Sequence, residues 1–402
     1  MYSYYLPGKI VFAIANIAGL TRYSAIWERT GHAPVEYWME GADLAPEGPA
    51  VWDGMLYAIH QQVLAEGGSV RVEGAVSAQC VKNMAELREL WQICLPQQYP
   101  GCDWEFATIQ PDRPTTQTGL LCAFSGGADA LFTLLRHKEK SRGAASYNIQ
   151  GALLVHGFDV PLARTDSFRT LERQCRYFLD TFEVPLHILR TNLREALPLD
   201  WEMTHGGMLA GCLHAYADRY AGAILGSSYS YNHFRFPWGS SPALDHLYAS
   251  SHFGLVHDGA GFTRSQKLGF LSCFPAALAA LKVCCYGDQP EKNCGKCRKC
   301  FRTRLSLRAH GVEHCEAFPE PLLSSEIASY RPRLPGELEL LESTYQECLQ
   351  LGAQGEWIGA YASMLKRARR WERTKEICRL LAGGQRSGLW RKIQQWRHGG
   401  GD

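Results

Sequence analysis

The sequence predicts an α/β fold, in which a doubly wound parallel sheet has an α+β module before it and a helical extension after it. From residue 118 onwards, continuous apolar runs alternate with helical patterns, as in a parallel sheet that helices cover on both faces. The preceding part mixes strand-like and helix-like stretches, and beyond residue 320 the chain reads as helical. We therefore expect three regions, 1–117, 118–310 and 311–402.

The N-terminal region shows short strand patterns and two helical ones. Apolar residues give strand patterns in KIVFAIAN, APVEYWME and SVRVEGAVS, and helical spacing marks residues 51–68 and 80–95. The stretch PDRPTTQTG at 111–119 is rich in proline and threonine and reads as a linker. We expect a small α+β module that joins the main domain at this linker.

The main domain repeats a strand followed by a helix. Helical patterns follow most of the apolar runs, in ADALFTLLRHKEK, TDSFRTLERQCRYFLDTF, THGGMLAGCLHAYADRY and TRSQKLGFLSCF. The expected strands are TGLLCAF, GALLVHG, PLHILRTN, AGAILGSS, FGLVHDGA and LKVCCY. Residues 229–253 have no helical pattern, and a loop of that length in a compact domain is usually functional or disordered.

The composition is that of a soluble globular protein, with 46% hydrophobic and 20% charged residues in a chain of 402. No signal peptide is apparent, and no window approaches the apolar length that a membrane span needs. The fifteen cysteines are an odd number in a large chain. We expect a cytoplasmic protein with no membrane association, whose thiols are core residues or metal ligands.

A glycine pair follows the first strand of the main domain, in CAFSGGADA at 122–130. Ligands of doubly wound sheets bind where a strand feeds its helix, and glycines let phosphate oxygens approach the backbone N–H groups there. A carboxylate beside phosphates is favourable only with a divalent cation, so Asp129 indicates Mg²⁺. Neither common nucleotide-binding glycine motif is present in this stretch, and a plain strand–helix turn is the alternative.

The cysteines Cys285, Cys294, Cys297 and Cys300 form the pattern C-x8-C-x2-C-x2-C. Tight C-x2-C turns point successive thiolates at one ion, and a distant cysteine completes a tetrahedron, as in structural zinc sites. Cys284 and Cys285 are neighbours on a strand-like run and face opposite sides, so one of them is expected to ligate, and the spacing favours Cys285. The alternative is a set of core or redox thiols.

The stretch S-G-G-A-D resembles the PP-loop, S-G-G-x-D-[ST], of ATP pyrophosphatases, which cleave ATP between the α and β phosphates and adenylate an oxygen. Ala130 stands where the family has Ser or Thr and loses one hydroxyl contact to phosphate. With the cysteine pattern downstream, residues 118–308 resemble the 7-cyano-7-deazaguanine synthase family. The resemblance implies the PP-loop type of doubly wound, Rossmann-like fold, with ATP, Mg²⁺ and a structural Zn²⁺.

The resemblance also implies a reaction. The family activates the carboxylate of 7-carboxy-7-deazaguanine with ATP, lets ammonia attack to form an amide, and dehydrates the amide to a nitrile. Relatives with extra domains occur in bacterial antiviral operons. We therefore expect ATP-dependent activation of this acid or a similar one, with ammonia, an amine, or a protein or peptide as acceptor. A homodimer is left open.

Further residues are expected around the nucleotide. Asp159 ends the second strand, where the family receives adenosine; the alternative is a solvated acid. His205-Gly206-Gly207 is read as preceding a helix whose N–H groups meet the α-phosphate; the alternative is a helix with packing glycines. Arg264 and Lys267 are expected to neutralise pyrophosphate and, with Asp129, to be catalytic. The full expected nucleotide set is Phe124, Ser125, Gly126, Gly127, Asp129, Ala130, Asp159, His205, Gly206 and Gly226.

The acceptor substrate is expected at PWGSSPALD, residues 237–245. There Trp238 can stack on a planar group while Ser240 and Asp245 read its polar edge; a packed loop is the alternative. The family's own base-reading pattern is not reproduced in this stretch, so the identity of the substrate does not transfer.

The tail is basic, since residues 366–402 hold eleven Lys/Arg against three acids, a net charge of +8. Interleaved tryptophans at 371, 390 and 396 would suit nucleic acid, but burial of these tryptophans on the main domain is the interpretation that we prefer. Two other functions stay open: a tRNA-modifying enzyme of the same fold, and a non-catalytic nucleotide-binding subunit, which Ala130 favours.

Overall fold

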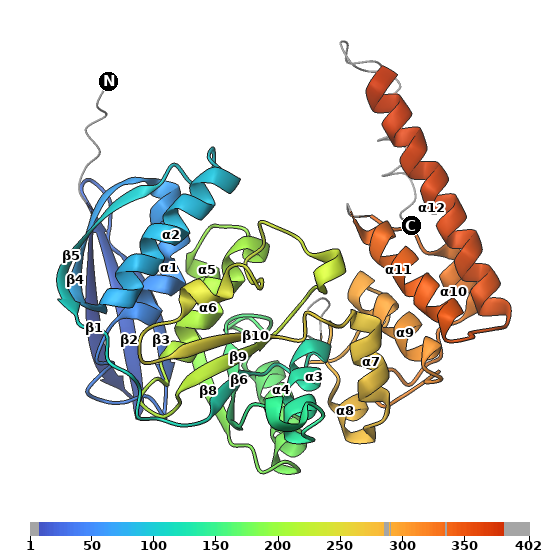
Figure 1. The fold of residues 1–402 in the computed structure, drawn as a ribbon, viewed down its shortest axis with the longest axis horizontal. Helices are drawn as coiled ribbons and strands as arrows, with labels where there is room; N and C mark the ends of the chain where they lie inside the picture. Colours follow the sequence, from blue (N-terminus) through green and yellow to red (C-terminus); the bar gives the residue numbers. More distant parts are fainter. Residues whose placement is uncertain (1–7, 285–288, 290, 334–335, 382–402) are drawn as a thin grey trace. The chain divides into compact units, whose positions relative to one another are not determined.

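The computed structural model describes residues 8–284, 289, 291–333 and 336–381 (Figure 1). The chain forms two compact units, which are described separately below. The first comprises Met1–Cys300 with Cys315–Phe318, and the second comprises Phe301–His314 with Pro319–Asp402. In the part of the chain that is described, no helix combines the length and the apolar character that crossing a membrane requires.

The first unit is built on one ten-stranded sheet with the order β10-β9-β6-β7-β8-β3-β2-β1-β4-β5. Six of the nine neighbouring pairs are parallel, so the expected α/β class with a mainly parallel sheet is confirmed. The strands are β1 Gly8–Ile17, β2 Leu20–Arg29, β3 Val35–Gly41, β4 Gly68–Ser77, β5 Cys102–Gln110, β6 Leu120–Ala123, β7 Ile149–His156, β8 Leu186–Thr191, β9 Gly222–Gly226 and β10 Gly254–Asp258.

The five strands from β6 to β10 are parallel to one another. Counted from β6, their order across the sheet is 3-2-1-4-5, the order of Rossmann-like sheets, and the point where it reverses lies between β6 and β9. The expected sixth strand, LKVCCY, does not form at residues 281–284. The N–H groups of Val283 and Cys284 bond instead to the side chain of Asn293, 2.9 and 3.2 Å away.

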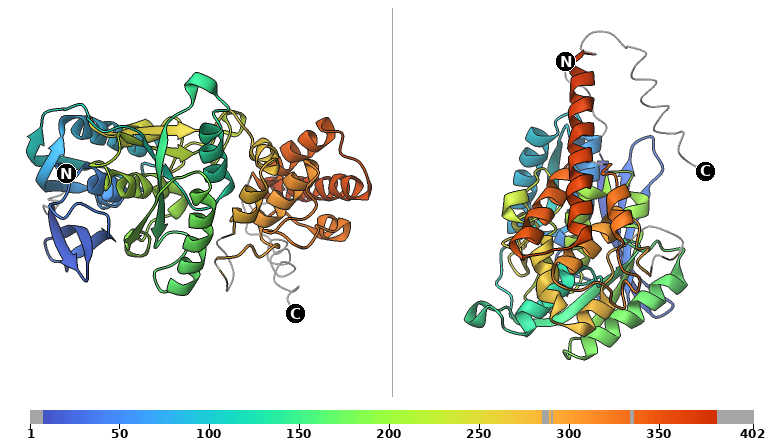
Figure 2. Two further views of the ribbon diagram at one scale, coloured as in Figure 1. Left: turned by 90° about the horizontal axis from the view of Figure 1, so that it is seen from below. Right: turned by 90° about the vertical axis from the view of Figure 1, so that its right-hand side faces the viewer.

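The helices of the first unit pack against this sheet (Figure 2). Their bounds are α1 Asp53–Glu66, α2 Ala78–Cys94, α3 Ala128–Lys138, α4 Thr165–Asp180, α5 Leu193–Ala196, α6 Trp201–His214, α7 Arg264–Ser272 and α8 Pro275–Ala280, with α9 Arg298–Ala309 leading into the second unit. Helices α1 and α6 pack closely because both carry glycine at the contact. A Cβ at Gly211 would lie 2.5 Å from the carbonyl oxygen of Gly54.

The N-terminal strands extend the sheet of the main domain, whereas the sequence predicts a separate module over 1–117. Strand β3 pairs antiparallel with β8, and one hydrophobic core runs from Ile10 to Phe253. At this junction the buried Glu40 accepts hydrogen bonds from Arg22 and Arg190, each at 2.6 Å. These ion pairs fix the register between β2, β3 and β8.

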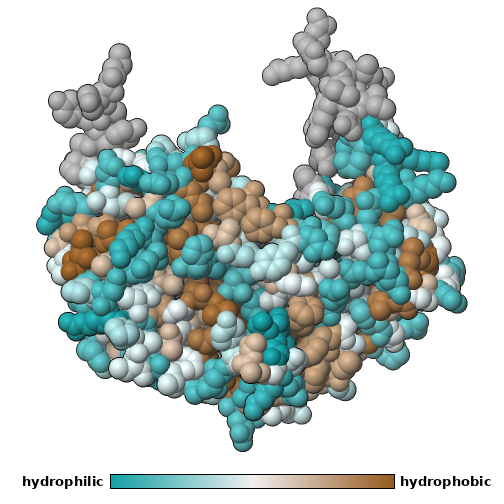
Figure 3. All heavy atoms as spheres, in the orientation of Figure 1, coloured by the Kyte–Doolittle hydropathy of each residue, from teal (hydrophilic) through white to brown (hydrophobic). Residues whose placement is uncertain are grey.

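The second unit is helical, as the sequence predicts for the C-terminal region. It contains most of α9, then α10 Ser324–Ser329, α11 Glu337–Gln350 and α12 Glu356–Leu381. The first half of α12 contributes Trp357, Tyr361 and Met364 to the core of this unit. The second half extends beyond α10 and α11 (Figure 2), and Figure 3 shows a group of hydrophilic side chains, in teal, at the upper right of this unit.

Candidate functional site

The glycine pair forms a tight turn between β6 and α3. Gly126 has φ +70°, a left-handed conformation that glycine adopts without steric cost. A Cβ at Gly126 would lie 3.1 Å from the carbonyl oxygen of Ala280. Gly127 is extended, at φ −70° and ψ 156°, and directly precedes α3. The path of the backbone therefore requires glycine at position 126, whereas the conformation of Gly127 is open to other residues.

The N-terminus of α3 carries no side-chain cap in the described part of the chain. Some other helices of this unit are capped, since Thr263 and Gln266 form a reciprocal capping box on α7 and Asp200 caps α6, whereas α1, α4, α5 and α8 also lack a side-chain cap from the residues described. The first N–H groups of a helix have no partner within it, and the helix dipole makes this end positive. The backbone N–H groups of the turn could thus donate hydrogen bonds to a bound anion.

Asp129 lies in the first turn of α3 and is held by two cations from α7. Its Oδ1 accepts from Nζ of Lys267 at 3.0 Å, and its Oδ2 accepts from Nη1 of Arg264 at 2.8 Å. Lys267 is buried, with 1% of its surface exposed, and also donates to the carbonyl oxygen of Ser227 just beyond β9. Arg264 and Lys267 are three residues apart, so they project from the same face of α7.

The charges of this cluster are not balanced. Burial by itself raises the pKa of Asp129, but the charges of Lys267 and Arg264 and their hydrogen bonds outweigh burial, and the pKa lies below its ordinary value. The carboxylate is therefore ionised at neutral pH, and two cations face one anion. One positive charge remains beside the uncapped end of α3.

Gly226 ends β9 next to this cluster. A Cβ at Gly226 would lie 2.6 Å from the carbonyl oxygen of Asp129, so only glycine lets β9 approach α3 so closely. Strands β6 and β9 are neighbours at the point where the strand order reverses, which is where sheets of this kind bind ligands. The structure thus brings Ser125, Gly126, Gly127, Asp129, Ala130, Gly226, Arg264 and Lys267 to one edge of the sheet.

Two expected nucleotide residues lie inside α6 and not before it. His205 and Gly206 follow four and five residues after the helix begins at Trp201, so their N–H groups do not form its N-terminus, and the predicted position before the helix is wrong. Gly206 serves packing, since a Cβ there would lie 1.8 Å from the carbonyl oxygen of Gly239. The Nδ1 atom of His205 lies 3.2 Å from the carbonyl oxygen of Trp201. Burial lowers the pKa of His205.

Phe124 and Asp159 have different surroundings. The Phe124 side chain is buried and stacks on Phe178, with ring centroids 5.9 Å apart, so only its backbone can face a ligand. Asp159 follows β7 and is exposed, with Oδ1 4.0 Å from Nη1 of Arg194. Its position suits a solvated acid at the mouth of the sheet.

The loop expected to hold the acceptor is organised by Asp245, which is 1% exposed. Its oxygens accept from Ser240 Oγ at 2.8 Å and from Ser241 N at 3.0 Å, and Oδ2 lies 2.7 Å from Nδ1 of His257. The carboxylate is thus committed to the loop itself. Trp238 is half-buried, and its Nε1 is buried without a partner among the described residues.

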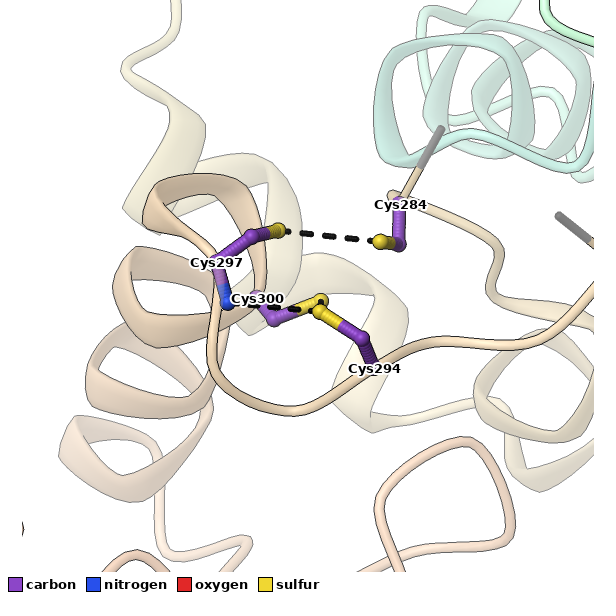
Figure 4. Close-up of side chains that lie close together, drawn as sticks. All are labelled: Cys284, Cys294, Cys297 and Cys300. Atoms are coloured by element: carbon purple, nitrogen blue, oxygen red, sulfur yellow. Dashed lines mark hydrogen bonds between the residues drawn. The ribbon is translucent and has the colours of Figure 1, made fainter. Parts of the chain in front are cut away.

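The four-cysteine cluster is formed by Cys284, Cys294, Cys297 and Cys300 (Figure 4). Their Sγ atoms all lie within 4.8 Å of one another and converge, from the segment after α8, the following loop and the start of α9. Cys285, which the spacing favours, lies outside the described residues. The Cys284 N–H donates a hydrogen bond to the side chain of Asn293, a contact that spacing does not reveal.

The cluster fits a tetrahedral zinc ion. Zinc–sulfur bonds of about 2.3 Å place tetrahedral sulfur atoms about 3.8 Å apart. The Cys284–Cys297 and Cys294–Cys300 Sγ pairs are 3.7 and 3.9 Å apart. The Cys297 N–H also points at Cys294 Sγ, 3.3 Å away. Four such thiols occupy every position of a tetrahedron, so a metal held here would be structural.

From Lys366 onwards, α12 is basic on its exposed face. Lys366, Arg370 and Arg373 follow one another at helical spacing, are exposed, and form no ion pair within the described residues. Trp371 is 38% exposed, contrary to the expected burial, and Lys375 lies over its ring at 5.6 Å. The other two tryptophans of the tail lie outside the described residues.

Comparisons of this chain with protein-family models, with curated proteins and with solved structures return no match.

Proposed function

We propose that this chain is an ATP-dependent ligase that adenylates a carboxylate, releases pyrophosphate, and passes the activated acyl group to ammonia or an amine. The observation that carries the proposal is the Asp129 carboxylate between Lys267 and Arg264, at the uncapped N-terminus of α3. A glycine turn, free helical N–H groups and excess positive charge on one edge of a Rossmann-like sheet suit a triphosphate.

The cations would act on the departing pyrophosphate. Charge develops on the bridging oxygen when the bond between the α and β phosphates breaks, and fixed cations stabilise that charge best where water is excluded. Lys267 is buried and Arg264 is about a quarter exposed, so both are held in place before the nucleotide arrives. On nucleotide binding, their hydrogen bonds to Asp129 would be exchanged for bonds to phosphate oxygens.

Asp129 would then be free to hold Mg²⁺, for which a carboxylate is a suitable hard ligand. The ion, when bound, supplies charge neutralisation on the triphosphate. Ala130 offers no hydroxyl, so the contacts of the chain to phosphate at this point would be through backbone N–H groups.

The acid is proposed to be 7-carboxy-7-deazaguanine or a similar planar acid, with ammonia or the amine of a protein or peptide as the acceptor. The half-buried ring of Trp238 is the part of this loop that would stack on such an acid, since its Nε1 is buried. Asp245 keeps the loop in shape through Ser240 and Ser241.

The direct test is to incubate the zinc-loaded protein with Mg²⁺, ATP and a panel of carboxylic acids that includes 7-carboxy-7-deazaguanine. The proposal requires formation of AMP and pyrophosphate that depends on the acid and is lost in Asp129→Ala. Asp166→Ala is the matched control, since Asp166 lies in the first turn of α4 and is solvent-exposed. ATP binding without pyrophosphate release, unaffected by Asp129→Ala, would instead support a non-catalytic nucleotide-binding subunit.

The basic face of α12 favours a second candidate, action on RNA. Three exposed cations at helical spacing suit a phosphate backbone, and such binding weakens steeply with salt. Arg370→Glu with Arg373→Glu should abolish retention of tRNA at low salt if RNA is the substrate. Equal retention by the parent chain and this variant would eliminate the candidate.

A further inference from the structure

A short segment joins the glycine turn to the cysteine cluster. Residues 281–284, the linking segment, run from the end of α8 to the first cysteine of the cluster. The Lys282 N–H donates to the carbonyl oxygen of Gly126 at 2.8 Å. The carbonyl oxygen of Ala280 also lies next to Gly126, 3.1 Å from the position that a Cβ would take there. The backbone of the turn therefore rests on the linking segment.

Asn293 holds the other side of the linking segment. Its Oδ1 accepts from the N–H groups of Val283 and Cys284, at 2.9 and 3.2 Å. Its Nδ2 donates to the carbonyl oxygens of Leu281 and Ala317, at 2.7 and 3.3 Å. All four hydrogen-bonding positions of the amide are thus used on backbone groups. Asn293 directly precedes Cys294, a member of the cluster.

We propose that Asn293 is a positioning residue that couples metal binding at the four cysteines to the conformation of the glycine turn. A metal that draws Cys284 and Cys294 together fixes Asn293 and the linking segment on both sides. The linking segment in turn holds the Gly126 carbonyl and, with it, the left-handed conformation of the turn. Loss of the metal frees the segment, and the turn loses its support.

The coupling has a reciprocal consequence, which rests on the proposed nucleotide function. Two ligands that favour the same conformation raise each other's affinity by the same factor. A nucleotide bound at the turn should therefore slow the loss of metal from the cluster, and the metal should raise nucleotide affinity equally.

Hydrogen–deuterium exchange of the full chain tests the coupling without reference to activity. The zinc-loaded protein is compared with the chelator-treated protein, following peptides that cover 119–131 and 278–284. We expect metal removal to speed exchange at the Lys282 N–H and in the glycine turn, with exchange in β7 unchanged. Unchanged exchange in the turn after complete metal removal would overturn the proposal.

Two variants separate positioning from folding. Asn293→Ala should release zinc to a colorimetric chelator about 10-fold faster than the parent and speed exchange in the turn. Asn293→Asp keeps the acceptor for the N–H groups of Val283 and Cys284. Its rates of zinc release and of exchange in the turn should therefore lie between those of the parent and of Asn293→Ala. Asn192→Ala is the control, since Asn192 also bonds backbone groups, Trp38 N–H and Glu36 C=O, at the β3–β8 junction. If Asn293→Ala retained parental zinc release and exchange, Asn293 would have no positioning role.

A final arm adds Mg²⁺-ATP during zinc release. Slowing by about fivefold or more would support both the coupling and the nucleotide site. Alternatively, chelation could speed exchange in the turn while ATP leaves the rate of zinc release unaltered. This result would support the coupling and count against the nucleotide site.

Discussion

The Nζ atom of Lys267 lies 3.0 Å from Oδ1 of Asp129, although the two residues are 138 positions apart in the chain. Lys267 also donates to the carbonyl oxygen of Ser227, so one buried ammonium links the starts of α3 and α7 to the end of β9. A buried lysine is rarely found unpaired, and here its partner stands at the mouth of the sheet. The same contact thus supports the fold and concentrates charge where a ligand would bind.

Replacing Lys267 should reduce the proposed reaction far more than replacing a lysine of an exposed ion pair. Lys267→Met leaves Asp129 with Arg264 alone, and we expect pyrophosphate release to fall about 100-fold or more. Lys82→Met is the matched control, because Lys82 forms an exposed pair with Asp112 at 3.6 Å. The control should change the free energy of unfolding by less than about 1 kcal/mol and leave turnover intact. Similar turnover in both variants would contradict a role for Lys267 in the reaction.

The lowered pKa of Asp129 predicts an acid-sensitive contribution to stability. The ionised carboxylate stabilises the folded chain above the pKa of an unfolded aspartate, about 3.9, and this contribution is lost as pH falls through the lower folded-state pKa. The free energies of unfolding of the parent and of Asp129→Asn, measured with denaturant, should therefore differ most at neutral pH. This difference should shrink below about pH 4. A difference that grows on acidification would contradict a lowered pKa of Asp129 in the folded chain.

Gly126 should be intolerant of a side chain for two separable reasons. Gly126→Ala places alanine in a left-handed conformation, which destabilises the fold by about 1–2 kcal/mol. The alanine Cβ would also lie 3.1 Å from the Ala280 carbonyl oxygen. Gly143→Ala isolates the first cost, since Gly143 has φ +55° and open space around it. Thermal unfolding should show the larger loss in Gly126→Ala, with loss of nucleotide binding in that variant only. Equal losses in the two variants would mean that the contact with Ala280 is unimportant.

Local patterns revealed most of this site because its central residues are close in sequence. The turn from Ser125 to Asp129 and the knuckles of Cys294 and Cys297 are each a few residues long, so residue type and spacing are enough to locate them. The partners of Asp129 were also predictable in kind, since a cationic first turn of a helix after a strand faces the same edge of a parallel sheet.

Other features depend on contacts that spacing does not encode. The start of α6 is set by the Asp200 cap before Trp201, so His205 and Gly206 fall one turn into the helix; an aspartate followed by helix formers was the signal for it. The joining of β3 to β8 depends on the buried Glu40 and arginines from two other strands. The hydrogen bond from the Cys284 N–H to the side chain of Asn293 is a third such contact.

Gly206 provides a test of the packing role that the structure gives to α6. Gly206→Ala would place its Cβ 1.8 Å from the Gly239 carbonyl oxygen, a contact with backbone that cannot be relieved by a rotamer change. We expect a loss of more than about 2 kcal/mol in the free energy of unfolding. Gly359→Ala is the control, because Gly359 lies inside α12 with nothing within 4 Å, and alanine there should stabilise by about 0.5–1 kcal/mol. A tolerated Gly206→Ala would refute the close approach.

The identity of the fourth cysteine can be decided by metal content. Cys284→Ser should lower zinc retention against a chelator by at least about 10-fold, because three thiolates then hold the ion. Cys285→Ser should retain zinc like the parent, and Cys273→Ser, at an exposed cysteine outside the cluster, controls for general thiol loss. Zinc is measured by mass spectrometry of the native protein after timed chelation. If Cys285→Ser lost the metal and Cys284→Ser kept it, the ligand would be Cys285, and the path from the cluster through Cys284 to the glycine turn would have to be abandoned.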